Sequence, residues 1–252
     1  MPDAAIAPVP SFAAGDGFAT YRGPAIDVAE HRHAAFQVAI AAGDGAVAIV
    51  DAAGTRREGA ALLVAPMARH RMLAGVELST FFIDPHSSYA DALRARGAGA
   101  GGAGGAGGAG VTAAPELRCL TAADLRPGRP SPALDPRLVA AMEAITAGGV
   151  TMADVAARVR LSPQRLRALA RDELGLPLLR WRAWVRLRAA AEALRDGAAI
   201  ADAALTAGFA DQAHLTRWMR EMMGLTPTVA LAALRGQAGT DPDAPAAPRR
   251  AT

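Results

Sequence analysis

The sequence contains no lysine, a single cysteine and few aromatic residues. All 27 basic residues are arginine, and Phe, Trp and Tyr make up 4% of the 252 residues. Cys119 has no partner for a disulfide within the chain, and no run of about 20 strongly apolar residues is present to span a bilayer. The first residues, MPDAAIAPVP, also lack the basic and apolar segments of a secretory signal. We therefore expect a cytoplasmic protein without a membrane partner, whose core is built from small side chains.

The charge is unevenly distributed along the chain. Residues 1–96 contain 8 arginines and 10 acidic residues, which gives a net charge of −2, whereas residues 135–235 contain 14 arginines and 10 acidic residues, which gives +4. Only the second half therefore has an electrostatic reason to approach a polyanion. Arginine also supplies the fork-shaped donors that suit phosphate and guanine.

A stretch of glycine and alanine divides the sequence. Residues 97–110 read GAGAGGAGGAGGAG and offer no side chain large enough to bury, so they are predicted to form a flexible tether. A segment containing Pro127, Pro130 and Pro132 follows. We expect an N-terminal domain at 1–96, a flexible linker at 97–134, a C-terminal domain at 135–236 and a disordered tail at 237–252.

Before the tether, short apolar runs alternate with turn signals. The runs are FQVAIA, AVAIV, AALLVAP and VELSTFFI, and Gly- or Asp-rich segments separate them. Such runs are typical of strands, and several in succession predict a small β-barrel or sandwich. Only SSYADALRARG is predicted to be helical in this half, and no strand is expected after the tether. The fold class is therefore α+β.

The C-terminal half begins with a short helix, a tight turn and a second helix. Thr151 is a suitable N-cap for a helix whose apolar face carries Met152, Val155, Ala156 and Val159. Ser162 caps the next helix, Pro163 occupies its first position and Gly175 ends it. Its outward residues are Gln164, Arg165, Arg167 and Arg171. This is the pattern of a helix-turn-helix unit with guanidinium and amide groups on its exposed face.

The same pattern repeats after a longer amphipathic helix at about 178–194. Ile200, Ala204 and Leu205 are predicted to form the apolar face of a short helix, Gly208 supplies the turn, and Asp211 caps the helix that follows. The buried stripe of that helix is predicted to be Leu215, Trp218, Met219 and Met222. Its outward residues are Gln212, His214, Thr216, Arg217 and Arg220. The chain therefore carries two helix-turn-helix units side by side.

These units, from VTMADVAARVRLSPQRLRALARDEL to IADAALTAGFADQAHLTRWMREMMGLTP, resemble the DNA-binding domain of the AraC/XylS family over residues 135–235. The first unit departs from the family pattern. Arg160 stands where the turn usually has Gly, which costs about 1 kcal/mol if that residue is left-handed. Ala168 and Ala170 replace a frequent arginine and a frequent phenylalanine. The second unit keeps the pattern better.

The resemblance implies a transcription regulator that binds double-stranded DNA, with RNA polymerase as a further possible partner. Arginine pairs with guanine and glutamine with adenine in the major groove. The family's contacts, carried over to this sequence, make Gln164 and Arg167 base readers in the first unit. In the second unit they make base readers of Gln212, Thr216 and Arg217. Phosphate contacts or lateral support are expected from Arg165, Arg171, His214 and Arg220.

The N-terminal half has a histidine pattern of its own. His31 and His33 are two residues apart, so in a strand both imidazoles lie on one face, as does Gln37 by parity. His70 follows a proline-bearing turn. This arrangement resembles the cupin-like sensor barrel of many AraC-family proteins, although metal-binding cupins usually have a glutamate where this chain has Gln37. The same resemblance implies dimerisation through the barrel. His86, in DPHSS, is expected at the surface.

Three roles are open for His31, His33 and His70. Neutral imidazoles and an amide can hold a transition metal, can line a pocket for a small organic effector, or can be structural. We expect no cofactor unless a metal occupies these three histidines. The alternative to a regulator is a cupin-type metalloenzyme with an appended helical domain, for which Gln37 is a poor ligand and no catalytic residue stands out.

Overall fold

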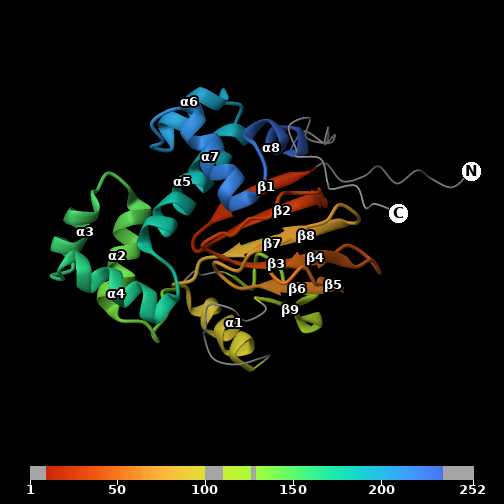
Figure 1. Ribbon diagram of the computed structural model, residues 1–252, viewed down its shortest axis with the longest axis horizontal. Coiled ribbons are helices and arrows are strands. Elements are labelled where there is room, and N and C mark those ends of the chain that lie inside the picture. Colours follow the sequence, from red (N-terminus) through yellow and green to blue (C-terminus); the bar gives the residue numbers. More distant parts are fainter. Residues whose placement is uncertain (1–9, 100–109, 126–128, 235–252) are drawn as a thin grey trace, which may run out of the picture.

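The computed structural model describes residues 10–99, 110–125 and 129–234. Figure 1 shows a strand-rich N-terminal half beside a helical C-terminal half. The α+β class expected from the sequence is confirmed. Within the described part of the chain, no helix is both long enough and apolar enough to cross a membrane. Most of the Gly/Ala stretch and the whole of the tail at 237–252 lie outside the described residues.

The described strands form two antiparallel sheets. They are β1 (Ser11–Gly15), β2 (Phe18–Pro24), β3 (Phe36–Ala41), β4 (Val47–Asp51), β5 (Arg56–Gly59), β6 (Ala61–Val64), β7 (His70–Met72), β8 (Glu77–Ile83) and β9 (Val111–Ala113). The larger sheet has the order β1-β2-β8-β3-β6-β9, and the smaller has the order β5-β4-β7.

Strand β3 lies at the centre of the larger sheet and is buried on both faces. Phe36, Val38 and Ile40 pack into one core cluster, whereas Ala39 and Ala41 pack into another together with residues of β4. The alternation follows from the two-residue period of a strand. The larger sheet is therefore covered by the smaller sheet on one face and by a helix, α1 (Ser88–Gly99), on the other.

The four strands predicted from apolar runs are β3, β4, β6 and β8, and the helix predicted before the tether is α1. The expectation that no strand follows the tether is wrong. Val111 pairs with Val64 of β6, and Ala114, Leu117 and Leu125 are buried against the larger sheet. Residues 110–125, which the sequence assigned to a flexible linker, therefore belong to the packed N-terminal half, because large apolar side chains resume at Val111.

The C-terminal half consists of helices joined by short turns. They are α2 (Pro136–Ala147), α3 (Met152–Arg158), α4 (Pro163–Leu174), α5 (Leu178–Arg195), α6 (Ile200–Thr206), α7 (Gln212–Met223) and α8 (Pro227–Leu234), preceded by a 3-10 turn, η1 (Pro115–Leu117). In Figure 1, α5 connects a group formed by α2, α3 and α4 with a group formed by α6, α7 and α8. Both helix-turn-helix units are therefore attached to one helix.

A single buried cluster crosses the boundary between the two halves. It contains Ala34 and Phe82 from the strand-rich half, and Trp184, Leu187 and Met219 from the helices. The ring centroids of Phe82 and Trp184 are 5.3 Å apart. Burial of two aromatic side chains contributes roughly several kcal/mol to the free energy of folding. The helices are therefore packed on the sheet and not merely tethered to it.

Candidate nucleic-acid interface and interdomain cavity

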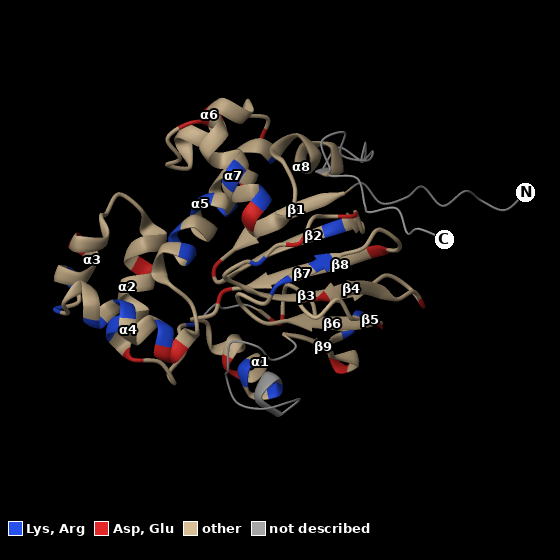
Figure 2. Ribbon diagram, in the orientation of Figure 1, with Lys and Arg blue, Asp and Glu red and all other residues tan. Residues whose placement is uncertain are grey.

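The first helix-turn-helix unit is formed by α3 and α4. Thr151 and Asp154 form a reciprocal capping box at the start of α3. The hydroxyl of Ser162 accepts a hydrogen bond from the Arg165 amide at the start of α4, with an N···O distance of 3.1 Å. The four residues predicted to face outward on α4 are all exposed, namely Gln164, Arg165, Arg167 and Arg171. The arginines of α4 are visible in Figure 2.

The second unit is formed by α6 and α7. Asp211 caps α7 through the amide of His214, at 2.6 Å. Gln212, Arg217 and Arg220 are exposed, whereas Thr216 is half-buried and its hydroxyl donates to the Gln212 carbonyl at 2.9 Å. Leu205, predicted to be part of the apolar face of α6, is 60% exposed, so that prediction is wrong. Ala203 takes its place in the core.

The two turns have the same backbone geometry. Arg160 has φ of 55° and Gly208 has φ of 81°. Each residue donates its amide to the carbonyl three residues earlier, at 3.0 Å in both turns. The residue that follows each donates to the carbonyl five residues earlier. Arg160 therefore has the left-handed conformation that the sequence suggested. Gly208 adopts the same conformation at the equivalent position of the second turn, where the missing Cβ avoids strain.

His214 is held against its neighbours and is half-buried. Its ring packs edge-on against Phe209 with a centroid distance of 5.4 Å. Its Nε2 lies 3.0 Å from Trp218 Nε1, and its Nδ1 lies 3.2 Å from the Ala210 amide. A neutral imidazole has one acceptor nitrogen, so it accepts one of these two bonds at a time. These contacts hold the His214 ring between α7 and the turn that precedes it.

Arg180 connects α5 with α7, a contact that the sequence analysis missed. It forms an ion pair with Glu221, and its guanidinium carbon lies 5.2 Å from the centroid of the Trp218 ring. The contact joins residues about 40 positions apart in the sequence, so no local sequence pattern could have predicted it. It holds the second unit against the helix that also carries the first.

The three N-terminal histidines and Gln37 come together as predicted, although only Gln37 and His70 lie in regular strands. His31 forms an isolated bridge with His70 of β7. The ring centroids of these two residues are 4.2 Å apart, and those of His33 and His70 are 5.0 Å apart. Oε1 of Gln37 lies 2.9 Å from His33 Nε2 and 3.0 Å from His70 Nε2. All four side chains are buried.

Burial keeps these imidazoles neutral. It lowers the pKa of His31 to about 3, with a further contribution from His33, and it lowers the pKa of His33 and that of His70 as well. A neutral imidazole is the form that binds metals and accepts hydrogen bonds. The cluster can therefore act as a set of lone-pair donors at neutral pH.

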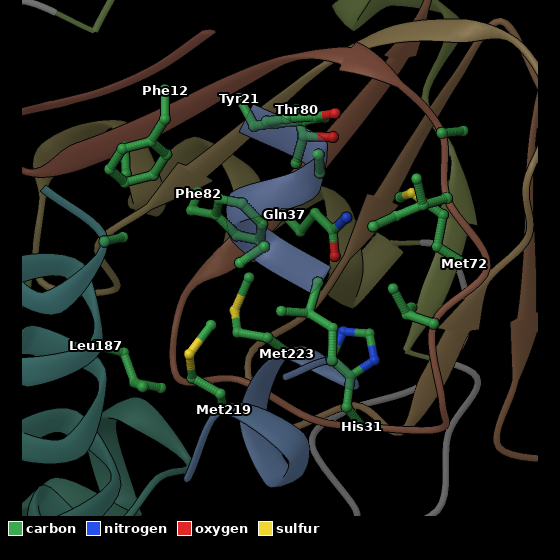
Figure 3. Close-up of a pocket in the computed structure, with 18 of the residues that line it drawn as sticks. Phe12, Tyr21, His31, Gln37, Met72, Thr80, Phe82, Leu187, Met219 and Met223 are labelled. Carbon is green, nitrogen blue, oxygen red and sulfur yellow. The ribbon is translucent and has the colours of Figure 1, made fainter. Parts of the chain in front are cut away.

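A cavity of about 160 Å³ lies between the sheet and the helices, beside this cluster. Figure 3 shows Phe12, Tyr21, Thr80 and Phe82 on the sheet side, with Leu187 of α5 and Met219 and Met223 of α7 opposite them. His31 and Gln37 are also among the lining residues, whereas His33 and His70 are not. Sequence patterns gave no signal for most of this lining, because it forms only when α5 and α7 pack on the sheet.

Backbone contacts join the end of α7 to the segment that carries His31. The Ala29 amide donates to the Gly224 carbonyl at 2.9 Å, and the Arg32 amide donates to the Glu221 carbonyl at 3.4 Å. Gly224 is left-handed, with φ of 69°, and a Cβ there would lie 2.2 Å from the Ala29 oxygen. Glycine is therefore required here both for its conformation and for the close approach.

His86, expected at the surface, is mostly inside the structure. Its ring packs edge-on against Trp181 with a centroid distance of 5.0 Å, and burial lowers its pKa. Its Nδ1 is buried without a hydrogen-bond partner among the described residues. The surface prediction is wrong because α5 covers this turn, which the polar sequence DPHSS did not indicate.

A helix-turn-helix family model matches residues 137–233, and the domain it describes is of the AraC type. This match covers both helix-turn-helix units, over which the sequence resembles the AraC family. The matched domain and the two capped units on α5 together support a DNA-binding transcription regulator. No curated protein is similar enough in sequence to match the chain.

Solved structures share the whole fold. ToxT from Vibrio cholerae O395 matches with a TM-score of 0.54 at 11% identity, over 88% of this chain and 100% of that chain. Unsaturated fatty acid bound wild-type ToxT from Vibrio cholerae strain SCE256 matches with a TM-score of 0.54 at 11% identity, over 90% of this chain and 99% of that chain. At these identities the likeness concerns the fold alone, and it covers both the sheet and the helices.

Proposed function

We propose that this regulator reads DNA by inserting α4 and α7 into successive major grooves of one duplex. The observation that carries the proposal is the matched pair of capped helices on α5, each with an exposed glutamine in its first turn and an exposed arginine within its first six residues. Successive grooves on one side of B-DNA are about 34 Å apart, so both helices can engage together only if one element holds them. Helix α5 is that element.

The exposed residues divide by chemistry into base readers and phosphate contacts. Gln164, Arg167, Gln212 and Arg217 are exposed on the recognition helices and have the bidentate groups that distinguish adenine and guanine. Thr216 is the remaining base reader in the proposal, and its hydroxyl is already engaged within α7. Arg165, Arg171 and Arg220 supply charge to the backbone, while His214 supports α7 from the side.

Two arginines on one helix provide a matched test of these roles. The full chain and its Arg217→Ala and Arg220→Ala variants are each subjected to selection from a random DNA library. We expect Arg217→Ala to relax the preference at one base position and to cost about 1 to 3 kcal/mol at the selected site. Arg220→Ala should weaken all sequences about equally and flatten the salt dependence of binding. The same unchanged preference in both variants would contradict the role of Arg217.

We further propose that the interdomain cavity binds the effector, and that the effector is small, uncharged and largely apolar. The walls are mainly aromatic and aliphatic, and the volume of about 160 Å³ is close to that of a cavity that holds benzene. Met219 and Met223 belong to α7, one of the two proposed recognition helices. A ligand that contacts them can therefore change the position of this helix and with it the affinity for DNA.

The polar groups of the cavity argue against an anionic effector. Arg188 is a cation in the wall, but it is already bonded to Asp84 and to the Gly15 carbonyl. The pKa of His31 is lowered to about 3 and that of Tyr21 is raised to about 12, so both are neutral. Thr80 and Gln37 are neutral as well. These groups suit one hydroxyl or carbonyl and do not compensate a carboxylate.

Benzyl alcohol and benzoate form a matched pair of probes for this cavity. We expect benzyl alcohol to raise the melting temperature of the full chain and to change its DNA affinity, and benzoate to do neither at the same concentration. Met223→Trp, which fills the cavity, should remove the response, and Leu205→Trp, at an exposed position, should keep it. Stabilisation by benzoate alone would overturn the ligand class while leaving the DNA-reading proposal intact.

The cavity also favours binding over catalysis. Apart from His31, its polar lining is Tyr21, Gln37, Thr80 and the ion-paired Arg188. A phenol with a pKa of about 12 is a poor acid or base near neutral pH. We therefore propose an effector-sensing role in preference to the enzyme alternative.

A further inference from the structure

The hydrogen bonds of His33 and His70 decide which way the amide of Gln37 faces. Nδ1 of His33 lies 2.9 Å from the Ala35 carbonyl oxygen. Nδ1 of His70 lies 3.0 Å from the Ala68 carbonyl oxygen. A carbonyl oxygen only accepts, so both Nδ1 atoms carry a proton. Burial lowers the pKa of both rings, so each is neutral and has no second proton. Each Nε2 is therefore an acceptor.

These two Nε2 atoms lie against the end of the Gln37 side chain. The Oε1 position is 2.9 Å from His33 Nε2 and 3.0 Å from His70 Nε2. An oxygen in that position faces two lone pairs, whereas an NH2 group there has one proton for each. A half-turn of the amide exchanges the two atoms without moving the rest of the side chain. Hydrogen bonding therefore directs the NH2 group to the histidines and leaves the amide oxygen on the other side.

The polar groups at this end of the cavity are mainly acceptors. Gln37 and His31 both line the cavity, and Figure 3 shows Gln37 between Thr80 and His31. Nδ1 of His31 lies 2.9 Å from a backbone oxygen, so the Nε2 of this neutral ring is an acceptor as well. The Tyr21 hydroxyl donates to a backbone carbonyl at 3.1 Å, which leaves its oxygen as an acceptor. A ligand that can only accept finds no donor in these three groups.

Thr80 lies next to Gln37 on the same face of the sheet. Ala39, two residues after Gln37 in β3, pairs with Thr80 of β8, so the side chains of Gln37 and Thr80 are diagonal neighbours. Thr80 is 3% exposed and lines the cavity. Its hydroxyl can donate as well as accept. One ligand oxygen can therefore donate a proton to the Gln37 amide oxygen and accept one from Thr80.

We propose that the effector carries a neutral hydroxyl group that donates to the Gln37 amide oxygen and accepts from Thr80, with His33 and His70 as positioning residues for the amide. This ligand class rests on the proposed effector cavity, and it narrows the effector to an alcohol or a phenol. A ketone, ester or ether of the same size would leave the amide oxygen unpaired in an apolar cavity. Two of the three buried histidines thereby have a structural role.

The tautomers of His33 and His70 test the orientation of the amide without any ligand. Long-range ¹H–¹⁵N correlation spectra of the full chain distinguish a protonated ring nitrogen from an unprotonated one. We expect a protonated Nδ1 and an unprotonated Nε2 in both rings at about pH 7. A proton on Nε2 of either ring would place the Gln37 oxygen against that ring and would overturn the proposal.

Three ligands with the same carbon skeleton test the effector class. In 1-phenylethanol the polar group donates and accepts, in acetophenone it only accepts, and ethylbenzene has no polar group. Their affinities for the full chain are measured by calorimetry. We expect 1-phenylethanol to bind at least about tenfold more tightly than acetophenone, because the ketone leaves the Gln37 acceptor unsatisfied. Thr80→Val should lower the affinity for 1-phenylethanol more than that for ethylbenzene, and Thr206→Val, at an exposed position, should change neither.

The outcomes separate this ligand class from the cavity itself. Equal affinity for the alcohol and the ketone would overturn the hydroxyl class and leave the cavity as the effector site. Binding of none of the three ligands would overturn the cavity as an effector site, and the hydroxyl class with it. Neither result bears on the DNA-reading proposal.

Discussion

Arg188 of α5 forms an ion pair with Asp84, which directly follows β8. Nη1 of Arg188 lies 2.7 Å from Oδ2 and 2.9 Å from Oδ1 of Asp84, and Nη2 lies 2.9 Å from the Gly15 carbonyl oxygen. The side chain of Asp84 is 3% exposed and that of Arg188 is 15% exposed. Since α5 also carries both helix-turn-helix units, this pair connects the sheet to the DNA-binding half in the interior of the molecule.

Removing one partner of this ion pair should lower the free energy of unfolding substantially. Asp84→Asn leaves the Arg188 charge inside without its counter-ion, and we expect a loss of about 3 kcal/mol in the free energy of unfolding, measured by urea denaturation. Asp196→Asn is the control, because the pair of Asp196 with Arg195 is exposed and should change the free energy by less than about 0.5 kcal/mol. Similar effects of the two substitutions would contradict a structural role for the buried pair.

Substitutions at two helix-ending glycines distinguish the cost of backbone strain from the cost of losing an interdomain contact. Gly175 ends α4 and Gly224 ends α7, both in the left-handed conformation, with φ of 68° and 69°. A Cβ at Gly175 meets nothing within 4 Å, whereas one at Gly224 meets the Ala29 oxygen. Gly175→Ala should cost about 1 kcal/mol. Gly224→Ala should cost at least twice as much in thermal denaturation, and equal losses would argue against the contact between α7 and residues 29–31.

A glycine in the turn of the first helix-turn-helix unit should make the protein more stable. Arg160 is left-handed, and Arg160→Gly removes the steric strain of its Cβ at some cost in chain entropy. We expect a gain of up to about 1 kcal/mol, seen as a higher melting temperature. Arg160→Ala also removes the charge but keeps the Cβ, so it should give no such gain. A gain of the same size in both variants would assign the effect to charge.

His86 should make the protein sensitive to mild acid. Burial lowers its pKa from 6.5 in the folded protein, while the nearby Asp84 and Glu143 oppose this shift and Arg188 and Arg94 add to it. Below pH 6.5 the unfolded chain binds a proton that the folded state does not, so stability falls as the pH falls, by up to about 1.4 kcal/mol per pH unit.

The substitution His86→Phe keeps the ring contact with Trp181 and removes the titration. The difference in unfolding free energy between the variant and the wild-type protein should therefore grow in favour of the variant from pH 7 to pH 5. Urea denaturation across this range measures it. The other buried histidines contribute equally to both proteins and cancel, so a constant difference would contradict the prediction.

The sequence by itself determined the two helix-turn-helix units. The side chains of Thr151, Ser162 and Asp211 each accept a hydrogen bond from the amide three residues later, and Gly175 and Gly224 each end a helix in the left-handed conformation. These interactions span a few residues, so spacing along the chain is sufficient to predict them. The same holds for strand β3, whose apolar run is long enough to be buried on both faces.

The tertiary structure alone decided what lies between the two halves. Asp84 and Arg188 are 104 residues apart, and His70 is 33 residues from Gln37. Residue spacing gives no distance across such separations, because the approach of two segments depends on how helices and sheet pack. Packing also reversed local expectations, since it buried His86 under α5 and joined residues 110–125 to the sheet, and it left Leu205 in solvent. The cavity beside the histidines exists only because Met219 and Met223 of α7 are packed against that sheet.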